Sequence, residues 1–429
     1  MTSEALKKAV LSGELDAAFT ADCGIVAEGL AAHRERVARA IEKFEEHYGA
    51  DRDVSLYSVG GRSEISGNHT DHNHGCVIAA SINLDIIAVA AKRDDGVIAV
   101  KSEGFPEDVV LPEANEAPDK SKFYTSAAII AGMERGLLRK GFNVGGFDAY
   151  TTSNVLKGSG LSSSAAFEVM IGNILNHLYN DGKVSNVDIA KMAKFAENKF
   201  FGKPCGLMDQ TACAVGGFIT IDFNDPSVPK IKKMDFDLTE AGYALCIVNT
   251  GGNHADLNED YASVPQEMRA VAAEFGQKVL RGLKVSDIIP RVPELREKLG
   301  DRAIMRAIHF IAENERVSWQ VAALREGDLP KFFEGVMESG RSSYEYLQNV
   351  YTSKNVREQG LSLALCLTEQ FLAGKNGAWR VHGGGFAGTI QAFVPLRYAK
   401  DYGEYMDAIF GAGSCYTLSV RRSGAVRIA

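Results

Sequence analysis

The chain has 429 residues, of which 45% are hydrophobic and 24% charged, and its formal net charge is −8 at pH 7. The length favours two domains, the acidic balance argues against a nucleic-acid partner, and no apolar run reaches the roughly 18 residues of a membrane span. The seven cysteines lack CxxC spacing and the N-terminus does not resemble a signal peptide, so we expect a cytoplasmic protein with reduced thiols.

In chain order, apolar residues at helical spacing first predict two helices within residues 5–49, joined near Gly24, that cover a domain or mediate self-association. From residue 54 onward, β-rich runs alternate irregularly with helical segments. The predicted strands are 55–59, 76–82, 86–91, 97–100, 147–152, 217–223, 244–249 and 389–394. The further predicted helices are 122–141, 163–179, 189–201, 301–326 and 361–374.

This order lacks the regular βαβ alternation of a doubly wound sheet and therefore predicts an α+β fold. The stretch 224–233 contains Pro226 and Pro229 and is the best candidate for a domain junction. We accordingly expect an N-terminal domain of residues 1–225 and a C-terminal domain of residues 226–429.

A glycine- and serine-rich loop precedes the predicted helix 163–179. Gly158 and Gly160 allow a tight turn, and the unpaired N–H groups at a helix N-terminus favour a phosphate group. The serine hydroxyls add further donors and one potential magnesium ligand. The loop lacks the ending of a Walker A motif, and a flexible loop that only caps the helix is the alternative.

The segment 61–75 is dense in asparagine, histidine and acidic residues, which suits a polyhydroxylated ligand. Its histidines His69, His72 and His74 could instead bind a metal, or the segment could simply form turns. Further along, Asp209 is a candidate general base or a turn residue, and Glu197 is a candidate magnesium ligand. The glycine-rich turn 382–388 exposes backbone but could be only a hairpin.

Together these segments resemble the GHMP-type kinases and, within them, the galactokinases. Residues 61–72 are similar to the family pattern Gly-Arg-x-Asn-Leu-Ile-Gly-Glu-His-Thr-Asp-Tyr, and residues 158–165 to Gly-x-Gly-Leu-Ser-Ser-Ser-Ala. Residues 205–210 match Cys-Gly-x-Met-Asp-Gln, and residues 383–386 match the Gly-Gly-Gly-Phe turn. The resemblance implies two α+β domains with ATP and a sugar in the cleft between them.

The resemblance also implies a role for each segment. Asp209 would act as base or positioning group at the acceptor hydroxyl, and Arg62 would stabilise the transferred phosphoryl group. Mg²⁺ would be held by Ser164 and Glu197. The residues implied for ATP are Gly158, Ser159, Gly160, Leu161, Ser162, Ser163 and Ser164, and those implied for the sugar are Asn68, His69, Asp71, Gly206 and Tyr261.

The implied substrate is galactose or a close relative, phosphorylated at C1, but the chain departs from the family pattern at the sugar segment. Asn68 stands where the family has Glu, Glu64 where it has Asn, and His72 where it has Tyr. In the family that Glu reaches towards the 6-hydroxyl, so a C6-modified sugar such as galacturonate is an alternative substrate. A non-catalytic sugar sensor and a kinase for a non-sugar alcohol are further alternatives. We expect a monomer or a weak homo-oligomer.

Overall fold

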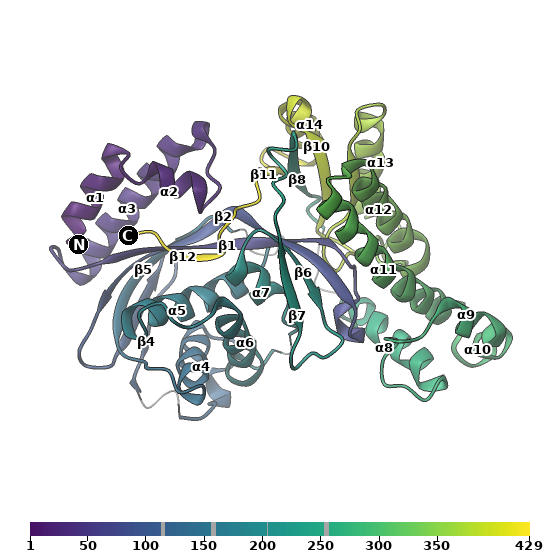
Figure 1. Ribbon diagram of the computed structural model, residues 1–429, viewed down its shortest axis with the longest axis horizontal. Helices are drawn as coiled ribbons and strands as arrows, with labels where there is room; N and C mark the ends of the chain where they lie inside the picture. Colours follow the sequence, from purple (N-terminus) through teal and green to yellow (C-terminus); the bar gives the residue numbers. More distant parts are fainter. Residues whose placement is uncertain (113–115, 156–159, 204, 253–256) are drawn as a thin grey trace.

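The computed structural model describes residues 1–112, 116–155, 160–203, 205–252 and 257–429 (Figure 1). An eight-stranded sheet runs through the larger part of the molecule in the order β12-β1-β2-β5-β3-β4, with β6 paired to β2 and β7 to β6. The pairs are antiparallel except β3 with β5. Its strands are β1 (Ser55–Ser66), β2 (Cys76–Lys92), β3 (Ile98–Ser102), β4 (Glu107–Val110), β5 (Phe147–Ser153), β6 (Phe218–Asp222), β7 (Lys230–Met234) and β12 (Ala425–Arg427).

One strand, β2, replaces the two strands predicted at 76–82 and 86–91. Its first half pairs with β6 and its second half with β5, while β1 follows it along the other side with two register shifts. The strand therefore continues through Ser81 to Asp85 where sequence reasoning placed a break.

Helices cover both faces of this sheet (Figure 1). One face carries α4 (Ser126–Arg139), α5 (Ser163–Tyr179), α6 (Asn186–Ala196), the π-helical turn η5 (Glu197–Phe201) and α7 (Met208–Val215). The other face carries α1 (Ser3–Ser12), α2 (Asp16–Ala21), the 3₁₀ turn η1 (Ala27–Gly29) and α3 (Leu30–Tyr48). The prediction of a covering N-terminal segment is confirmed, since Val37, Ile41 and Phe44 pack against Leu56 and Val89 of the sheet.

The N-terminal segment contains more helices than the two predicted. Gly13, with a φ of 83°, ends α1 in the left-handed conformation, and its N–H group donates to the carbonyl of Val10. Because α2 then forms before Gly24, the predicted first helix is two shorter ones.

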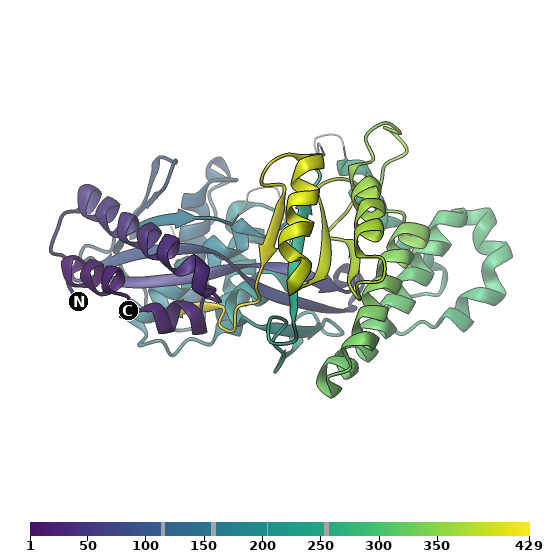
Figure 2. The ribbon, with the colours of Figure 1, turned by 90° about the horizontal axis from the view of Figure 1, so that it is seen from above.

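A second, four-stranded antiparallel sheet has the order β11-β8-β10-β9 (Figure 2). Alternate residues of β8 face opposite helical layers: Cys246 packs with α13 and α14, and Leu245 belongs to the core that contains Phe332 of α12. The strands are β8 (Tyr243–Asn249), β9 (Ala378–Val381), β10 (Thr389–Pro395) and β11 (Cys415–Leu418). The main helices are α11 (Asp301–Glu326), α12 (Leu329–Ser342), the π-helical turn η7 (Ser343–Leu347), α13 (Gly360–Leu372) and α14 (Leu396–Phe410).

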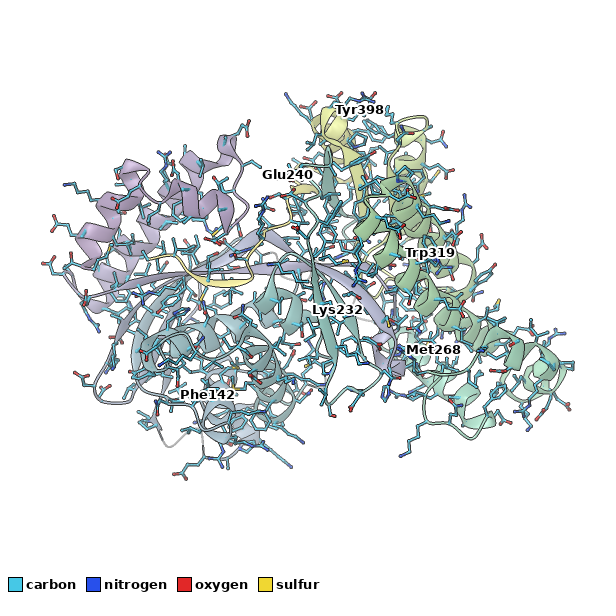
Figure 3. The ribbon with its side chains drawn as sticks, in the orientation of Figure 1. Phe142, Lys232, Glu240, Met268, Trp319 and Tyr398 are labelled. Atoms are coloured by element: carbon cyan, nitrogen blue, oxygen red, sulfur yellow. The ribbon has the colours of Figure 1, made fainter. Side chains whose placement is uncertain are left out.

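The end of the molecule beyond α11 is formed by helices that also reach the loop after β1. There Met268 of α8, labelled in Figure 3, accepts a hydrogen bond from the Asn73 side chain at 3.4 Å. These helices are α8 (Asn258–Glu274), α9 (Val285–Ile288), the 3₁₀ turn η6 (Ile289–Arg291) and α10 (Val292–Leu299).

The predicted α+β class is confirmed, whereas the strands do not divide at residue 225. Both β7 and the C-terminal β12 belong to the first sheet, so the last residues of the chain return to the N-terminal part. The sequence did not predict this strand because β12 has only three residues. Among the described residues, no helix is long and apolar enough to cross a membrane.

Candidate active site

The described part of the glycine-serine loop leads directly into α5. Gly160 and Ser162 both adopt left-handed conformations, with φ values of 71° and 59°. Ser162 is the N-cap residue, but its side chain makes no capping hydrogen bond, so it leaves the first N–H groups of α5 without a side-chain acceptor. Such a helix N-terminus favours a phosphate group. Gly158 and Ser159 lie outside the described residues.

Arg62, Asp209 and Ser162 come together beside this loop, although they lie far apart in sequence. The Arg62 Nε donates to Asp209 Oδ1 at 2.9 Å, its Nη2 lies 2.8 Å from Oδ2, and the Ser162 hydroxyl donates to Oδ2 at 2.6 Å. Burial alone would raise the pKa of Asp209, but Arg62 and Ser162 bring it below its ordinary value. Asp209 is therefore held as a carboxylate, with 36% of its side chain exposed.

A cavity of about 570 Å³ opens next to the start of α5. Ser163 and Ser164 line one part of it, together with Phe167 and Glu168 of the same helix. Three aromatic residues from other elements, Phe105, Tyr124 and Phe201, also line it. Sequence reasoning missed these rings because they come from three separate segments, and no motif marks them.

Two buried carboxylates, Glu168 and Glu197, lie close together, and Glu168 also lines this cavity. Gln210 Nε2 donates to Glu168 Oε2 at 3.1 Å and to Glu197 Oε2 at 2.8 Å, while Lys203 Nζ lies 3.2 Å from Glu197 Oε1. Glu168 Oε1 and Gln210 Oε1 are buried and have no hydrogen-bond partner in the part of the chain that the structure describes. Burial and the neighbouring Glu197 raise the pKa of Glu168 well above its ordinary value.

Asn68, predicted to face a sugar, is fully buried. Its Nδ2 donates to Glu64 Oε1 at 3.0 Å and to the Gly383 carbonyl at 2.7 Å. Its Oδ1 accepts from Ser343 Oγ at 3.1 Å and from Asn349 Nδ2 at 2.9 Å. Every donor and acceptor of this amide already has a protein partner. The Asn68 side chain is therefore not directed at a sugar in this structure.

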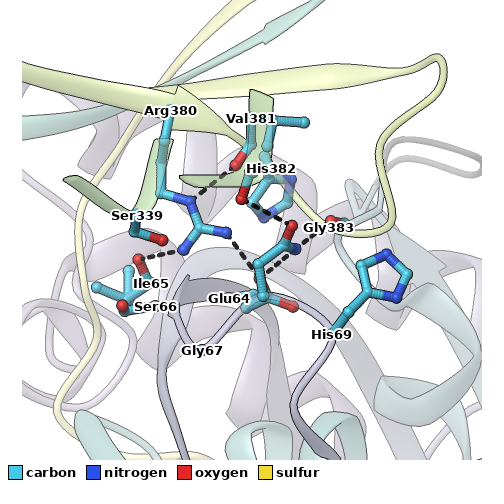
Figure 4. Close-up of polar contacts among 12 residues, drawn as sticks. Glu64, Ile65, Ser66, Gly67, His69, Ser339, Arg380, Val381, His382 and Gly383 are labelled. Atoms are coloured by element: carbon cyan, nitrogen blue, oxygen red, sulfur yellow. Dashed lines mark hydrogen bonds and ion pairs between the residues drawn. The ribbon is translucent and has the colours of Figure 1, made fainter. Parts of the chain in front are cut away.

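Arg380 lies on the other side of Glu64 and is also fully buried (Figure 4). Its Nη2 lies 3.1 Å from Glu64 Oε1, and its Nη1 and Nε donate to the carbonyls of Ile65 and Val381. Glu64 and Asn68 thus bond to each other, with the carboxylate and the amide in exchanged positions relative to the galactokinase pattern. In this chain the carboxylate and the amide form a buried hydrogen-bonded pair.

The loop that carries Asn68 is held from α11. Glu313 Oε1 accepts from the N–H groups of Gly67 and Asn68 at 3.0 and 3.2 Å, and Glu313 pairs with Arg316. His309 Nε2 lies 3.0 Å from the Asn68 carbonyl oxygen. Glu313 and His309 of α11 therefore support the loop.

Of the other predicted sugar residues, two contact the glycine turn 383–385, and Asp71 and Gly206 lie against each other. His69 Nε2 lies 2.9 Å from the Gly384 carbonyl oxygen, and the Tyr261 hydroxyl donates to the Gly385 carbonyl at 2.7 Å. A Cβ atom on Gly206 would lie only 2.8 Å from Asp71 Oδ2, so the missing side chain allows these segments to approach. The turn is therefore part of the site rather than an isolated hairpin.

The metal alternative for the histidines finds no support. Within the described residues, no group of three His, Cys, Asp or Glu side chains is arranged to hold a metal ion.

The sequence matches two family models, the galactokinase galactose-binding signature over residues 42–92 and the GHMP kinases N terminal domain over residues 126–217. It is 32% identical to a galactokinase of Streptomyces coelicolor over 84% of this chain and 89% of that one. It is 34% identical to a galactokinase of Glaesserella parasuis over 82% of this chain and 88% of that one.

Solved structures agree with these matches. The galactokinase of Lactococcus lactis complexed with galactose has a TM-score of 0.75 at 25% identity, over 91% of this chain and 99% of that one. The mevalonate kinase of Methanococcus jannaschii shares the fold, with a TM-score of 0.60 at 12% identity over 86% of this chain and 99% of that one.

Proposed function

The chain belongs to the galactokinase family, and on that premise we propose that it transfers the γ-phosphoryl group of ATP to the anomeric C1 hydroxyl of galactose. Its relatives named galactokinase cover most of its length, and one neighbour was solved with galactose bound. The galacturonate alternative loses its basis, because it required an Asn68 amide directed at the ligand, and that amide is saturated by protein partners.

The arrangement of Arg62, Asp209 and Ser162 at the start of α5 carries this proposal. Phosphoryl transfer needs positioning and electrostatic stabilisation more than covalent chemistry. A carboxylate kept ionised at this point can accept the proton or hydrogen bond of the acceptor hydroxyl, and the guanidinium can stabilise charge on the transferred group. The same arrangement disfavours a sugar sensor that lacks catalysis.

The nucleotide has a matching place beside these residues. The N–H groups at the start of α5, with Ser163 and Ser164, would bind the phosphates, and the aromatic part of the cavity would take the adenine base. Gly158, Ser159, Gly160 and Leu161 keep the phosphate role that the family motif implies.

Magnesium is the second cofactor of the proposal, with Ser164 and Glu197 as its protein ligands. Once bound it would neutralise phosphate charge. The partnerless oxygens of Glu168 and Gln210 beside Glu197 fit a cation there, since oxygen atoms are the ligands that Mg²⁺ prefers. Lys203, whose side chain is 57% exposed, would have to leave Glu197 when the ion binds.

For the sugar, we retain His69, Asp71, Gly206 and Tyr261 as contact residues. Asn68 has a different role in this proposal: it joins β1, η7 and the glycine turn, and so fixes the loop from which His69 and Asp71 project. A polyhydroxylated ligand needs several hydrogen bonds in fixed positions, so a rigid loop favours selectivity.

The test is ATP consumption by the purified protein with Mg²⁺ and one sugar at a time, followed by ³¹P NMR of the product. We expect turnover of galactose and a product resonance coupled to the anomeric proton. Turnover of galacturonate or an inositol in preference to galactose would overturn the proposed substrate. Phosphorylation at another hydroxyl would overturn the proposed position.

A further inference from the structure

Glu168 has not been assigned as a ligand of the nucleotide, the magnesium ion or the sugar. We propose that Glu168 is a third protein group of the divalent-cation site, beside Ser164 and Glu197, and that Gln210 holds the two carboxylates in place. The inference rests on the proposed function in one respect, namely that a divalent cation accompanies the nucleotide.

The helix α5 directs Glu168 to the required position. Residues four apart in a helix lie on the same face, so Glu168 stands one turn below Ser164. Both residues line the cavity at the start of α5, and Glu168 is 0% exposed. A ligand bound at Ser164 would therefore lie next to the Glu168 carboxylate, which is more deeply buried than Ser164.

Gln210 connects Glu168 to the predicted ligand Glu197. Its Nε2 atom donates to both carboxylates, at 3.1 Å to Glu168 and 2.8 Å to Glu197. The two acidic groups therefore share a single donor atom. Gln210 directly follows Asp209 on α7, which fixes this cluster relative to the catalytic carboxylate.

Two buried oxygen atoms in the cluster point to a missing partner. Among the described residues, Glu168 Oε1 and Gln210 Oε1 have no hydrogen-bond partner, and a buried polar atom without a partner is unfavourable. A second donor from the protein could have satisfied these two oxygen atoms. Among the described residues, however, the only cation that pairs with either carboxylate is Lys203, and it pairs with Glu197. A bound divalent cation, directly or through one of its waters, would satisfy them.

The chemistry matches magnesium rather than a transition metal. Mg²⁺ is usually held by one or two carboxylates together with substrate phosphates, and keeps several of its waters. Two glutamates and a serine fit that pattern. They also agree with the absence, within the described residues, of any three-residue acidic, histidine or cysteine cluster that would make a complete protein cage.

The test measures cation affinity directly. Mn²⁺ would be titrated into the protein with a non-hydrolysable ATP analogue, in the absence of sugar, and free Mn²⁺ followed by electron paramagnetic resonance. We expect Glu168→Gln to weaken Mn²⁺ binding by about 10–100-fold. Glu197→Gln serves as the positive control. Glu134→Gln, a buried carboxylate on α4, controls for loss of a buried acid and should leave the affinity unchanged.

An unchanged Mn²⁺ affinity in folded Glu168→Gln would overturn the proposal. If that variant does not fold, as judged by circular dichroism, Gln210→Met replaces it: weaker Mn²⁺ binding would support the proposal, and wild-type affinity would contradict it. Because no sugar is present, failure of the protein to phosphorylate galactose would leave this result intact, so the two proposals can fail separately.

Discussion

The phosphate side and the sugar side of this active site are built in different ways. On the phosphate side, a short contiguous segment and the start of α5 supply several groups, and Glu168 and Gln210 nearby each keep one buried oxygen atom without a partner among the described residues. On the sugar side, the loop after β1 is held by residues of α11, η7 and the glycine turn, and its central amide is saturated. Unsatisfied polar groups indicate where a ligand binds, whereas buried satisfied ones indicate what holds the binding loop.

The largest expected effect tests the phosphate side. Asp209→Asn should lower kcat by about 10²–10⁴-fold, because the amide cannot take the proton of the acceptor hydroxyl and does not pair with the Arg62 charge. The measurement is steady-state kinetics with ATP and galactose, with circular dichroism to show that the fold is kept. Near-normal turnover in a folded variant would remove Asp209 from the mechanism.

On the sugar side, Asn68→Glu should act on stability. The new carboxylate would face Glu64 in a buried site and lose the two contacts that the amide donates, which we expect to cost about 3–5 kcal/mol of unfolding free energy. The measurement is urea unfolding. The matched control is the double exchange Glu64→Asn with Asn68→Glu, which restores one carboxylate and one amide and should recover at least half of the loss. Equal instability of both variants would contradict the pairing.

The sequence allows prediction of the phosphate loop and of the helix that follows it because their residues are contiguous. The helix at 163–179 and its preceding loop follow from local pattern, and so does the long helix at 301–326, both found at the predicted residues. The role of Asn68 could not be predicted, because its partners Ser343 and Asn349 are more than 270 positions away. Motif comparison shows that a residue differs, but only tertiary contacts show which way its side chain bonds.

A third prediction concerns acid. Burial lowers the pKa of His309 to about 4 and of His382 to about 3, from an ordinary value of 6.5. Between the folded-state pKa values and the ordinary value of 6.5, the two histidines bind more protons in the unfolded chain than in the folded one. The unfolding free energy should therefore fall as pH drops from about 6.5 towards 4. Glu313, with a pKa lowered to about 2, adds a loss below about 4.5 in the same direction.

Urea unfolding at pH 7.5, 6 and 5 would show this loss, which should reach a few kcal/mol by pH 5. His309→Gln should reduce the slope between pH 6 and 5, because one proton fewer is taken up on unfolding. A midpoint that stays constant from pH 7.5 to 5 would contradict the buried neutral state of both histidines, and with it the rigidity assigned to the sugar side.

The last prediction compares two ion pairs of similar length, and Lys203→Met is the variant with the smallest expected effect. Lys203 lies 3.2 Å from Glu197 on the phosphate side and is 57% exposed, whereas Arg380 lies 3.1 Å from Glu64 on the sugar side and is 0% exposed. Lys203→Met should cost about 1 kcal/mol of unfolding free energy, because solvent screens the exposed Lys203 ammonium group although Glu197 is buried. Arg380→Met should cost about 3–5 kcal/mol, since it leaves a buried carboxylate without its cation. Both variants would be measured by urea unfolding at one pH. An equal loss of unfolding free energy in the two would contradict the proposed difference between the exposed lysine and the buried arginine.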